Sequence, residues 1–204
     1  MNPVQIKKFL EAHSTKRDRT IVIVDFANVD KWKNSLGWSV GIQELANLIK
    51  NISYGKQFLR RFYYGENYGP QESTATLLPW SKSILEKARM NRFELVTKRV
   101  KYIHSADNVH GYEMKCDLDV EMAVDLIRER DNYDSIFIFS GDGDLAYVLQ
   151  YLHSQYGKEA YVFGARGHFG KEIIDAKLAG TVKEVFYADD FEYRLSVQRR
   201  GTHR

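Results

Sequence analysis

Residues 21–24, Ile-Val-Ile-Val, form an unbroken run of β-branched side chains that ends at Asp25. A strand that is apolar at every position is typical of a sheet buried on both faces, and such sheets are mostly parallel. Parallel neighbours need a connection long enough to hold a helix. This one run therefore predicts an α/β fold in which helices cover both faces of a sheet.

The rest of the chain repeats the pattern of apolar runs separated by helix-length segments. Further strands are predicted at residues 58–64, 93–100, 135–140, 159–164 and 182–187. Helices are predicted around residues 42–49, 77–88, 115–130, 145–152 and 171–178, and the aperiodic residues 102–113 are predicted to form a surface loop. We expect a doubly wound, mainly parallel sheet with the strand order 3-2-1-4-5, which places strands one and four side by side.

Length and composition limit the class of protein. A chain of 204 residues suits one domain with short appendages, and we divide it into an N-terminal helical, basic extension (1–19), an α/β domain (20–195) and a basic C-terminal tail (196–204). The single cysteine, Cys116, excludes an internal disulfide framework and a cysteine-rich zinc site, and it fits a reducing compartment. The first twenty residues hold no apolar segment long enough for a signal peptide or a membrane span, so we expect a cytoplasmic protein. The net charge of +3 does not by itself indicate a nucleic-acid partner.

Residues 137–145, Phe-Ile-Phe-Ser-Gly-Asp-Gly-Asp-Leu, have the pattern of a strand, a tight turn and the start of a helix. Asp142 and Asp144 repel each other unless a cation or a hydrogen-bond donor offsets their charges. The alternative is that Asp144 caps the following helix and Asp142 serves the turn, since both roles are common for aspartate. From these residues alone both interpretations stay open.

Two other acids are expected to meet this pair. Asp25 ends strand one, and the ends of strands one and four would meet where the strand order reverses, which is where α/β sheets bind ligands. Asp119 lies on the apolar arc of the helix predicted after the loop, at roughly 100° per residue. A carboxylate on a core-facing stripe is costly unless it is paired or binds a metal. A salt bridge to Lys115, one turn earlier, is the alternative.

The acids that we expect to converge are Asp25, Asp119, Asp142 and Asp144. Four converging carboxylates suit a hard divalent cation, Mg²⁺ or Mn²⁺. Such ions activate water and stabilise the charge that develops on a phosphoryl group. The chemistry that fits is metal-dependent hydrolysis of a phosphodiester, with these four residues as metal-binding and catalytic groups.

Four segments together resemble the successive motifs of the NYN domain family, the LabA-like branch of the PIN-like nucleases. They are residues 24–29 (VDFANV), 115–125 (KCDLDVEMAVD), 139–145 (FSGDGDL) and 157–164 (GKEAYVFG), and the resemblance covers roughly residues 20–195. It implies a PIN-like α/β fold, a metal site made by the motif acids, and ribonuclease activity where the family is active. By position it assigns the metal acids to Asp25, Asp119, Asp142 and Asp144, with Asn28, Ser140 and Asp125 in supporting roles.

The chain departs from the family pattern at three places. Cys116 stands where the family often has Gly, Gly143 stands where Ser is common, and residues 164–170 lack the family's Ser-x-x-Leu pattern. These departures leave the metal acids intact and bear on the choice of substrate.

Aromatic and basic side chains are expected near the same face. Rings can stack on unpaired bases, and cations can hold phosphates, as single-stranded RNA requires. On this basis the nucleic-acid-binding residues are predicted to be Tyr64, Tyr68, Lys101, Lys115, Arg166 and His168. The alternative is that the tyrosines pack beneath a loop and the cations are simply solvated.

The leading hypothesis is a Mg²⁺- or Mn²⁺-dependent endoribonuclease, a hydrolase that acts on single-stranded or structured RNA. DNA as substrate and a homodimer remain open, and no membrane partner is expected. A non-catalytic RNA-binding or regulatory module that keeps the acidic pocket is the alternative. A phosphatase of the haloacid-dehalogenase type is disfavoured, because Asp25-Phe26-Ala27 lacks the Asp-x-Asp nucleophile pattern.

Overall fold

The structure is a computed structural model, and it describes residues 19–53, 57–70, 75–105 and 111–197. The predicted N-terminal extension and basic C-terminal tail lie almost entirely outside the described residues. None of the helices within these ranges combines the length and the apolar character that crossing a membrane requires.

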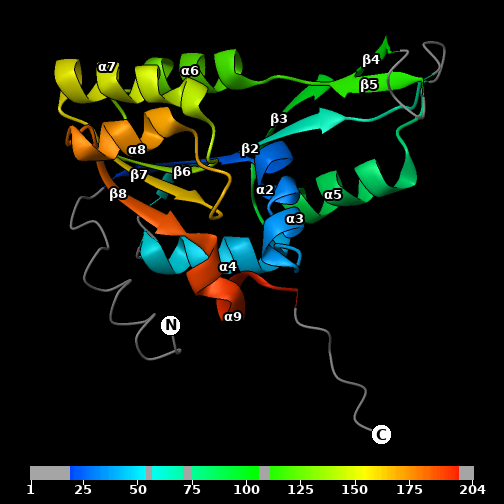
Figure 1. Cartoon of the computed structure of the whole chain (residues 1–204), viewed down its shortest axis with the longest axis horizontal. Coiled ribbons are helices and arrows are strands. Elements are labelled where there is room, and N and C mark those ends of the chain that lie inside the picture. Colours follow the sequence, from blue (N-terminus) through cyan, green and yellow to red (C-terminus); the bar gives the residue numbers. More distant parts are fainter. Residues whose placement is uncertain (1–18, 54–56, 71–74, 106–110, 198–204) are drawn as a thin grey trace, which may run out of the picture.

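The core of the fold is a six-stranded parallel sheet with the order β3-β2-β1-β6-β7-β8 (Figure 1). Its strands are β1 (Thr20–Asp25), β2 (Gln57–Glu66), β3 (Glu94–Arg99), β6 (Ser135–Phe139), β7 (Glu159–Gly164) and β8 (Val182–Tyr187). The order differs in detail from the expected 3-2-1-4-5, because two further strands precede β6 along the chain and β8 adds a sixth strand to the sheet. The expected pairing of strand one with the strand before the Asp142 turn is present as β1 beside β6.

Two strands lie outside this sheet. β4 (Lys101–His104) and β5 (Tyr112–Lys115) pair antiparallel as a separate ribbon, which projects beyond β3 in Figure 1. The prediction of a surface loop over residues 102–113 was therefore wrong for residues 102–104 and 112–113, whereas residues 106–110 lie outside the described residues. The prediction of a helix that begins at Lys115 was also wrong, since α6 spans Asp119–Arg128. Most residues of the ribbon are exposed on both faces, so it lacks the alternation by which a half-buried strand is recognised.

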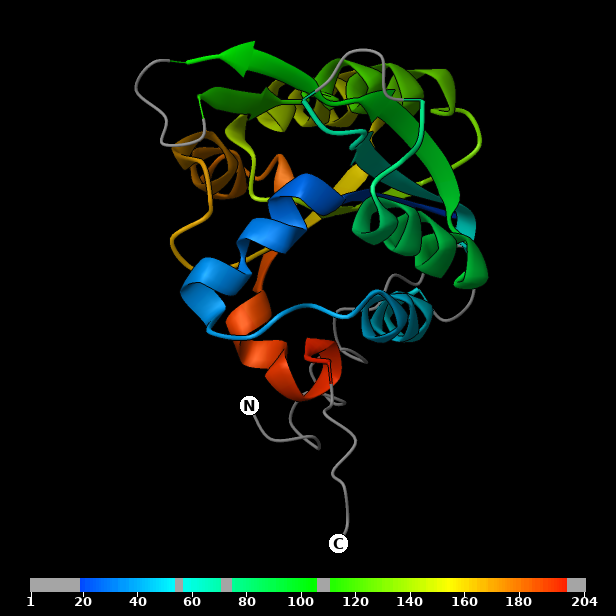
Figure 2. The same ribbon diagram turned by 90° about the vertical axis from the view of Figure 1, so that its right-hand side faces the viewer.

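Helices cover both faces of the sheet, as Figures 1 and 2 show. One face carries α2 (Phe26–Lys31), α3 (Lys33–Leu36), α4 (Ile42–Ile52), α5 (Pro79–Met90) and α9 (Glu192–Leu195), and the other carries α6, α7 (Ala146–Tyr156) and α8 (Lys171–Leu178). Successive strand residues point to opposite faces. In β1, Val22 and Val24 pack in the first core, whereas Ile21 and Ile23 pack in the second. This double burial is why the run at residues 21–24 is apolar at every position. Two short 3-10 helices, η1 (Gly143–Leu145) and η2 (Ala188–Phe191), complete the described elements.

A buried ion pair joins β2 to α6. Arg61 Nη1 lies 2.7 Å from Asp125 Oδ2, and the Tyr63 hydroxyl donates to the same oxygen at 2.7 Å. Burial is the main cause that raises the pKa of Tyr63 above its ordinary value, and the hydrogen bond to Asp125 adds to it, so the phenol stays a donor. Asp125 is thus held among core side chains by a cation and a hydroxyl.

Replacing Asp125 tests this network. We expect Asp125→Ala to lower the free energy of unfolding by about 2 kcal/mol, because the Tyr63 hydroxyl loses its acceptor and Arg61 loses its nearest carboxylate. Arg61 keeps only the more distant carboxylates of Glu129, at 3.6 Å, and Glu94, at 3.8 Å. Urea denaturation measures this loss of stability. Asp131→Ala is the control, because the Asp131 side chain is 76% exposed. Equal stability of the two variants would contradict a structural role for Asp125.

Candidate functional site

The four acids predicted to converge, Asp25, Asp119, Asp142 and Asp144, all line one cavity of about 260 Å³. The cavity is built from the end of β1, helix α2, the segment between β5 and α6, and the turn after β6. Its remaining lining residues are Ala27, Asn28, Lys31, Cys116, Asp117, Leu118 and Met122. Residues far apart in the sequence therefore meet beyond the carboxyl ends of β1 and β6, which is where open α/β sheets bind ligands.

Asp25 is fixed where β1 passes into α2. It caps α2 by accepting from the Asn28 backbone N–H at 3.1 Å, and its other oxygen accepts from Ser140 Oγ at 3.1 Å. The Asn28 side-chain oxygen accepts in turn from the Gly141 N–H at 3.1 Å and from Trp32 Nε1 at 2.8 Å. Burial raises the pKa of Asp25, and the two hydrogen bonds that it accepts offset only part of this effect. Asn28 and Ser140 thus tie the end of β1 to the turn after β6.

Asp142 and Asp144 have different roles in the turn. Asp142 caps η1 by accepting from the Asp144 N–H at 3.1 Å, and its own N–H donates to Ser140 Oγ at 3.2 Å. Asp144 lies inside the 3-10 helix and is exposed. The alternative in which Asp144 caps the following helix was therefore wrong, because the capping residue is Asp142. Asp142 caps η1 and also lines the cavity, so its side chain can combine capping with the binding of an ion.

Two glycines let other segments approach this turn. A Cβ on Gly141 would lie 1.9 Å from the His168 carbonyl oxygen, and the Gly170 N–H donates to the Gly141 carbonyl at 2.7 Å. A Cβ on Gly143 would lie 2.2 Å from Glu172 Oε2. Gly143 thus makes room for a carboxylate of α8, which gives a physical reason for glycine at this departure from the family pattern.

Asp119 is the first residue of α6 rather than part of a longer helix. Lys115 ends β5, and no Lys115–Asp119 salt bridge forms among the residues described, so the alternative pairing is not made. The Asp119 N–H instead donates to Asp117 Oδ1 at 3.0 Å. Burial raises the pKa of Asp119 to about 7, and the hydrogen bond and charge of Asp117 add to the shift, as do Asp142 and Asp25. The cavity therefore holds more negative charge than its own residues neutralise.

Some residues predicted for the site lie elsewhere. Asp125 belongs to the ion pair with Arg61 and does not line the cavity. Tyr64 is 6% exposed, and its hydroxyl donates to Ser81 Oγ of α5 at 3.1 Å, so this tyrosine packs in the core, against a helix rather than beneath a loop. Arg166 lies 3.0 Å from Asp190 in an ion pair at the start of the β7–α8 connection. These three side chains are held by other parts of the fold.

The other predicted nucleic-acid contacts lie near the ribbon or the turn. Lys101 and Lys115 are exposed and face each other across β4 and β5. The Tyr68 ring lies under the Arg99 guanidinium, 4.6 Å from it. His168 is half-buried, and its carbonyl packs on Gly141.

Two charged residues of the cavity, Lys31 and Asp117, were not predicted from the sequence. Lys31 lies one helical turn after Asn28, and this spacing could have indicated it once Asn28 was placed in the site. Asp117, two residues before Asp119, also lines the cavity and was not among the predicted site residues. Lys98 Nζ donates to the Asp117 backbone carbonyl at 3.0 Å and to the Glu121 carboxylate at 2.8 Å. These two bonds fix the segment before α6.

The donor set fits a hard divalent cation. In the described ranges no group of three or more His, Cys, Asp or Glu side chains is arranged to hold a metal ion. Mg²⁺, however, is commonly held by one or two carboxylates together with water and substrate phosphates, so a complete protein cage is unnecessary. The raised pKa of Asp119 and of Asp25 indicates that a cation would lower the electrostatic cost of the cavity.

The fold and the cavity define an α/β domain with an acidic site at the switch point of its sheet. The family model of the NYN domain matches residues 19–179, so the chain belongs to the NYN domain family, as the motifs indicated. This family is part of the PIN-like nuclease superfamily.

Two similar proteins add to this assignment. Low amplitude and bright protein LabA from Synechococcus elongatus is 34% identical over 59 residues, which are 29% of this chain and 32% of LabA. The match thus spans about a third of that relative. A crystal structure of a protein of unknown function from Vibrio parahaemolyticus has a TM-score of 0.63 at 19% identity, over 87% of this chain and 96% of the other. This likeness shows the fold alone.

The pKa of Asp119 predicts how stability depends on pH. Its value of about 7 exceeds the ordinary 3.8, so the folded state binds this proton more tightly than the unfolded state. The metal-free protein should therefore lose stability as pH rises from about 4 to about 7. In EDTA the melting temperature of the parent protein should fall between pH 5 and pH 8. Asp119→Asn removes the titrating carboxyl, so we expect this fall to be about 2 °C smaller in the variant. A profile unchanged from that of Asp131→Asn would contradict the raised pKa.

Proposed function

We propose that this protein is a metal-dependent endoribonuclease that hydrolyses phosphodiester bonds of single-stranded or structured RNA. One observation carries the proposal: Asp25, Asp119, Asp142 and Asp144, from three separate segments, line one cavity beyond the ends of β1 and β6. Membership of the NYN domain family supports a nuclease-type activity. Mg²⁺ or Mn²⁺, when bound, supplies an activated water and stabilises charge on the phosphoryl group.

The residues of the chain have separate tasks in this proposal. Asp25 is held rigidly by Ser140 and the Asn28 N–H, and Asp142 is held by the cap of η1, so both carboxylates are preorganised for an ion. Asp119 enters from α6 across the cavity and brings a third carboxylate. The Lys31 ammonium, also in the lining, can hold a substrate phosphate as a point charge.

Substitution of the central acids tests catalysis. We expect Asp142→Asn and Asp25→Asn each to reduce Mn²⁺-stimulated cleavage of single-stranded RNA at least about 100-fold, since each removes an anionic ligand. EDTA should abolish cleavage by the parent protein. Asp131→Asn is the matched control, and RNA binding by fluorescence anisotropy verifies that each variant is folded. The proposal fails if both variants cut as fast as the parent, in EDTA as well as in Mn²⁺.

A non-catalytic RNA-binding module is the second candidate. It is favoured by the observation that no three acids within the described residues are arranged to hold one ion. RNA binding without metal-stimulated cleavage over several substrates would support this candidate over the nuclease.

The β4–β5 ribbon is the proposed contact with the RNA backbone. It leads directly into Cys116 and Asp117 of the cavity wall. Lys101 and Lys115 are directly opposite each other in its ladder, and like charges in such a pair are destabilising unless an anion offsets them. The ring of Tyr112, 42% exposed in the same ribbon, adds a stacking surface for an unpaired base.

Salt dependence tests this contact. The affinity for single-stranded RNA should fall as salt rises. In the double variant Lys101→Ala/Lys115→Ala we expect the slope of log affinity against log salt to be less steep, by about 0.7 for each lysine removed. Lys82→Ala is the control, because Lys82 is 67% exposed on α5 and belongs to neither the ribbon nor the cavity. Equal slopes for the double variant and the control would rule out the ribbon as a phosphate contact. A DNA oligonucleotide of the same sequence, titrated in parallel, tests the choice of RNA.

A further inference from the structure

Trp32 lies at the end of helix α2 and is fully buried. Its indole N–H donates to Asn28 Oδ1 at 2.8 Å, one helical turn back along the chain. Asn28 lines the acidic cavity, whereas Trp32 does not. A buried tryptophan usually finds a partner for its N–H, and here that partner is a side chain of the candidate active site. Trp32 therefore supports the cavity from behind its wall.

Two donors fix the orientation of the Asn28 side-chain amide. Besides the indole N–H of Trp32, the Gly141 N–H donates to the same Oδ1 at 3.1 Å. Rotating the amide by 180° would set its amino group against both donors, so the hydrogen-bond network assigns the oxygen to this side. The amino nitrogen, Nδ2, is then directed away from Trp32 and Gly141.

The Asn28 amino group is left free by the residues that the structure describes. Neither of its N–H groups donates a hydrogen bond within these ranges. Asn28 is half-buried, and Nδ2 is not among the buried nitrogen and oxygen atoms that lack a partner, so solvent reaches it. Because the side chain lines the cavity, this donor is available to a group bound there.

The wall that carries this donor suits an anion. Helix α2 contributes Ala27, Asn28 and Lys31 to the lining, and none of these three is acidic. Asn28 and Lys31 are three residues apart, which makes them neighbours on one face of the helix. One neutral donor and one cation therefore lie side by side, and both are groups that phosphate oxygens accept.

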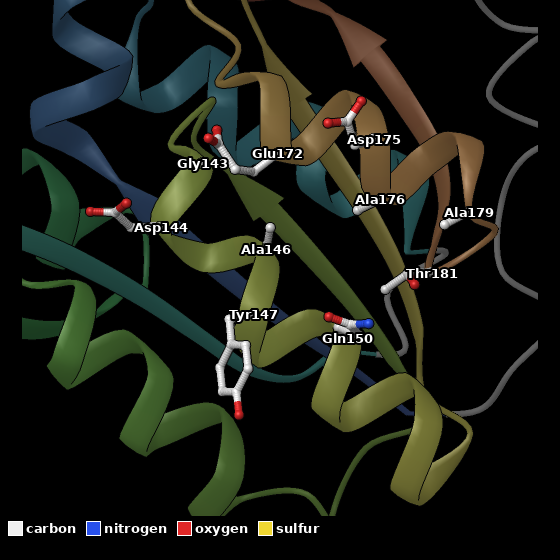
Figure 3. Close-up of a pocket in the computed structure, with 10 residues that line it drawn as sticks. All are labelled: Gly143, Asp144, Ala146, Tyr147, Gln150, Glu172, Asp175, Ala176, Ala179 and Thr181. Atoms are coloured by element: carbon white, nitrogen blue, oxygen red, sulfur yellow. The ribbon is translucent and has the colours of Figure 1, made fainter.

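Three of the acids come from other elements. Asp119 begins α6, and Asp142 and Asp144 belong to the turn after β6. Figure 3 shows the Asp144 carboxylate directed away from Glu172 of α8. The cavity thus combines acids, which suit a cation, with the donors of α2, which are left for the oxygens of a phosphate.

We propose that Trp32 is a positioning residue, which holds the Asn28 amide so that Nδ2 donates to a non-bridging oxygen of the scissile phosphate. The donor is oriented before the substrate binds, so it needs no reorganisation as negative charge develops on that oxygen. The inference rests on the proposed function, because the phosphate is that of the RNA bond to be cut. It assigns a task in catalysis to a residue outside the cavity.

Sulfur in place of the accepting oxygen tests this role, since sulfur is a weak acceptor. RNAs with one phosphorothioate at the cut site, in either configuration, are compared with the same RNA without sulfur. In the parent protein, sulfur in one configuration should slow cleavage. In Trp32→Phe the ratio of the two rates should be about fivefold smaller, which is the effect of one neutral hydrogen bond. Trp80→Phe is the control, because Trp80 is 52% exposed on α5, and its ratio should equal that of the parent.

This ratio separates positioning from stability. A loss of folded protein in Trp32→Phe lowers the rates on both RNAs equally and leaves their ratio unchanged. Asn28→Ala removes the donor itself and should lower the ratio at least as much as Trp32→Phe does. A ratio in Trp32→Phe that equals the ratio of the parent, for both configurations, would overturn the proposal.

NMR tests the same hydrogen bond without cleavage. In the ¹⁵N-labelled full chain, a single-stranded RNA oligonucleotide added with Ca²⁺ should shift the Asn28 side-chain amide signals. The shift should be smaller in Trp32→Phe than in Trp80→Phe. This pattern in a protein that cuts no RNA would overturn the nuclease proposal and leave the positioning role standing. Cleavage by a parent protein whose Asn28 amide signals do not respond to RNA would overturn the positioning role alone.

Discussion

The parallel pairing of β1 with β6 is the constraint on which the acidic site depends. It brings the ends of the two strands together, and the Ser140 hydroxyl joins them by donating to Asp25. At each strand end a carboxylate then caps the helix that follows, Asp25 for α2 and Asp142 for η1. Local capping and sheet topology thus direct both side chains to one cavity, and α6 adds Asp119 from the layer above.

This arrangement places negative charge where the folded chain alone does not neutralise it. The pKa values of Asp25 and Asp119 are raised, mainly by burial, so both carboxylates oppose folding when ionised. Arg61 and Asp125 show the contrasting case on the same layer, where a buried acid has its cation and belongs to the fold. Uncompensated charge in a preorganised cavity is a feature of functional sites, in which local stability is given up for chemistry.

The sequence predicted the strands of the main sheet and the meeting of the acids, because strands buried on both faces are apolar throughout and their carboxyl ends share one edge. The β4–β5 ribbon was missed because a hairpin exposed on both faces has no apolar alternation. Helical periodicity led to the prediction that α6 begins at Lys115. The helix begins instead at Asp119, whose N–H donates to Asp117, and periodicity does not reveal such a local hydrogen bond. Burial of Tyr64 and the partners of Asp125 depend on tertiary contacts that no spacing reveals.

Whether the cavity holds a divalent cation is the central question, and a crystal soaked in Mn²⁺ answers it most directly. Anomalous scattering at the manganese edge locates the ion independently of any activity. We expect a peak within the cavity, in contact with carboxylate oxygens of Asp25, Asp119 or Asp142. A cavity without a peak, with Asp119 still bonded to Asp117, would contradict it.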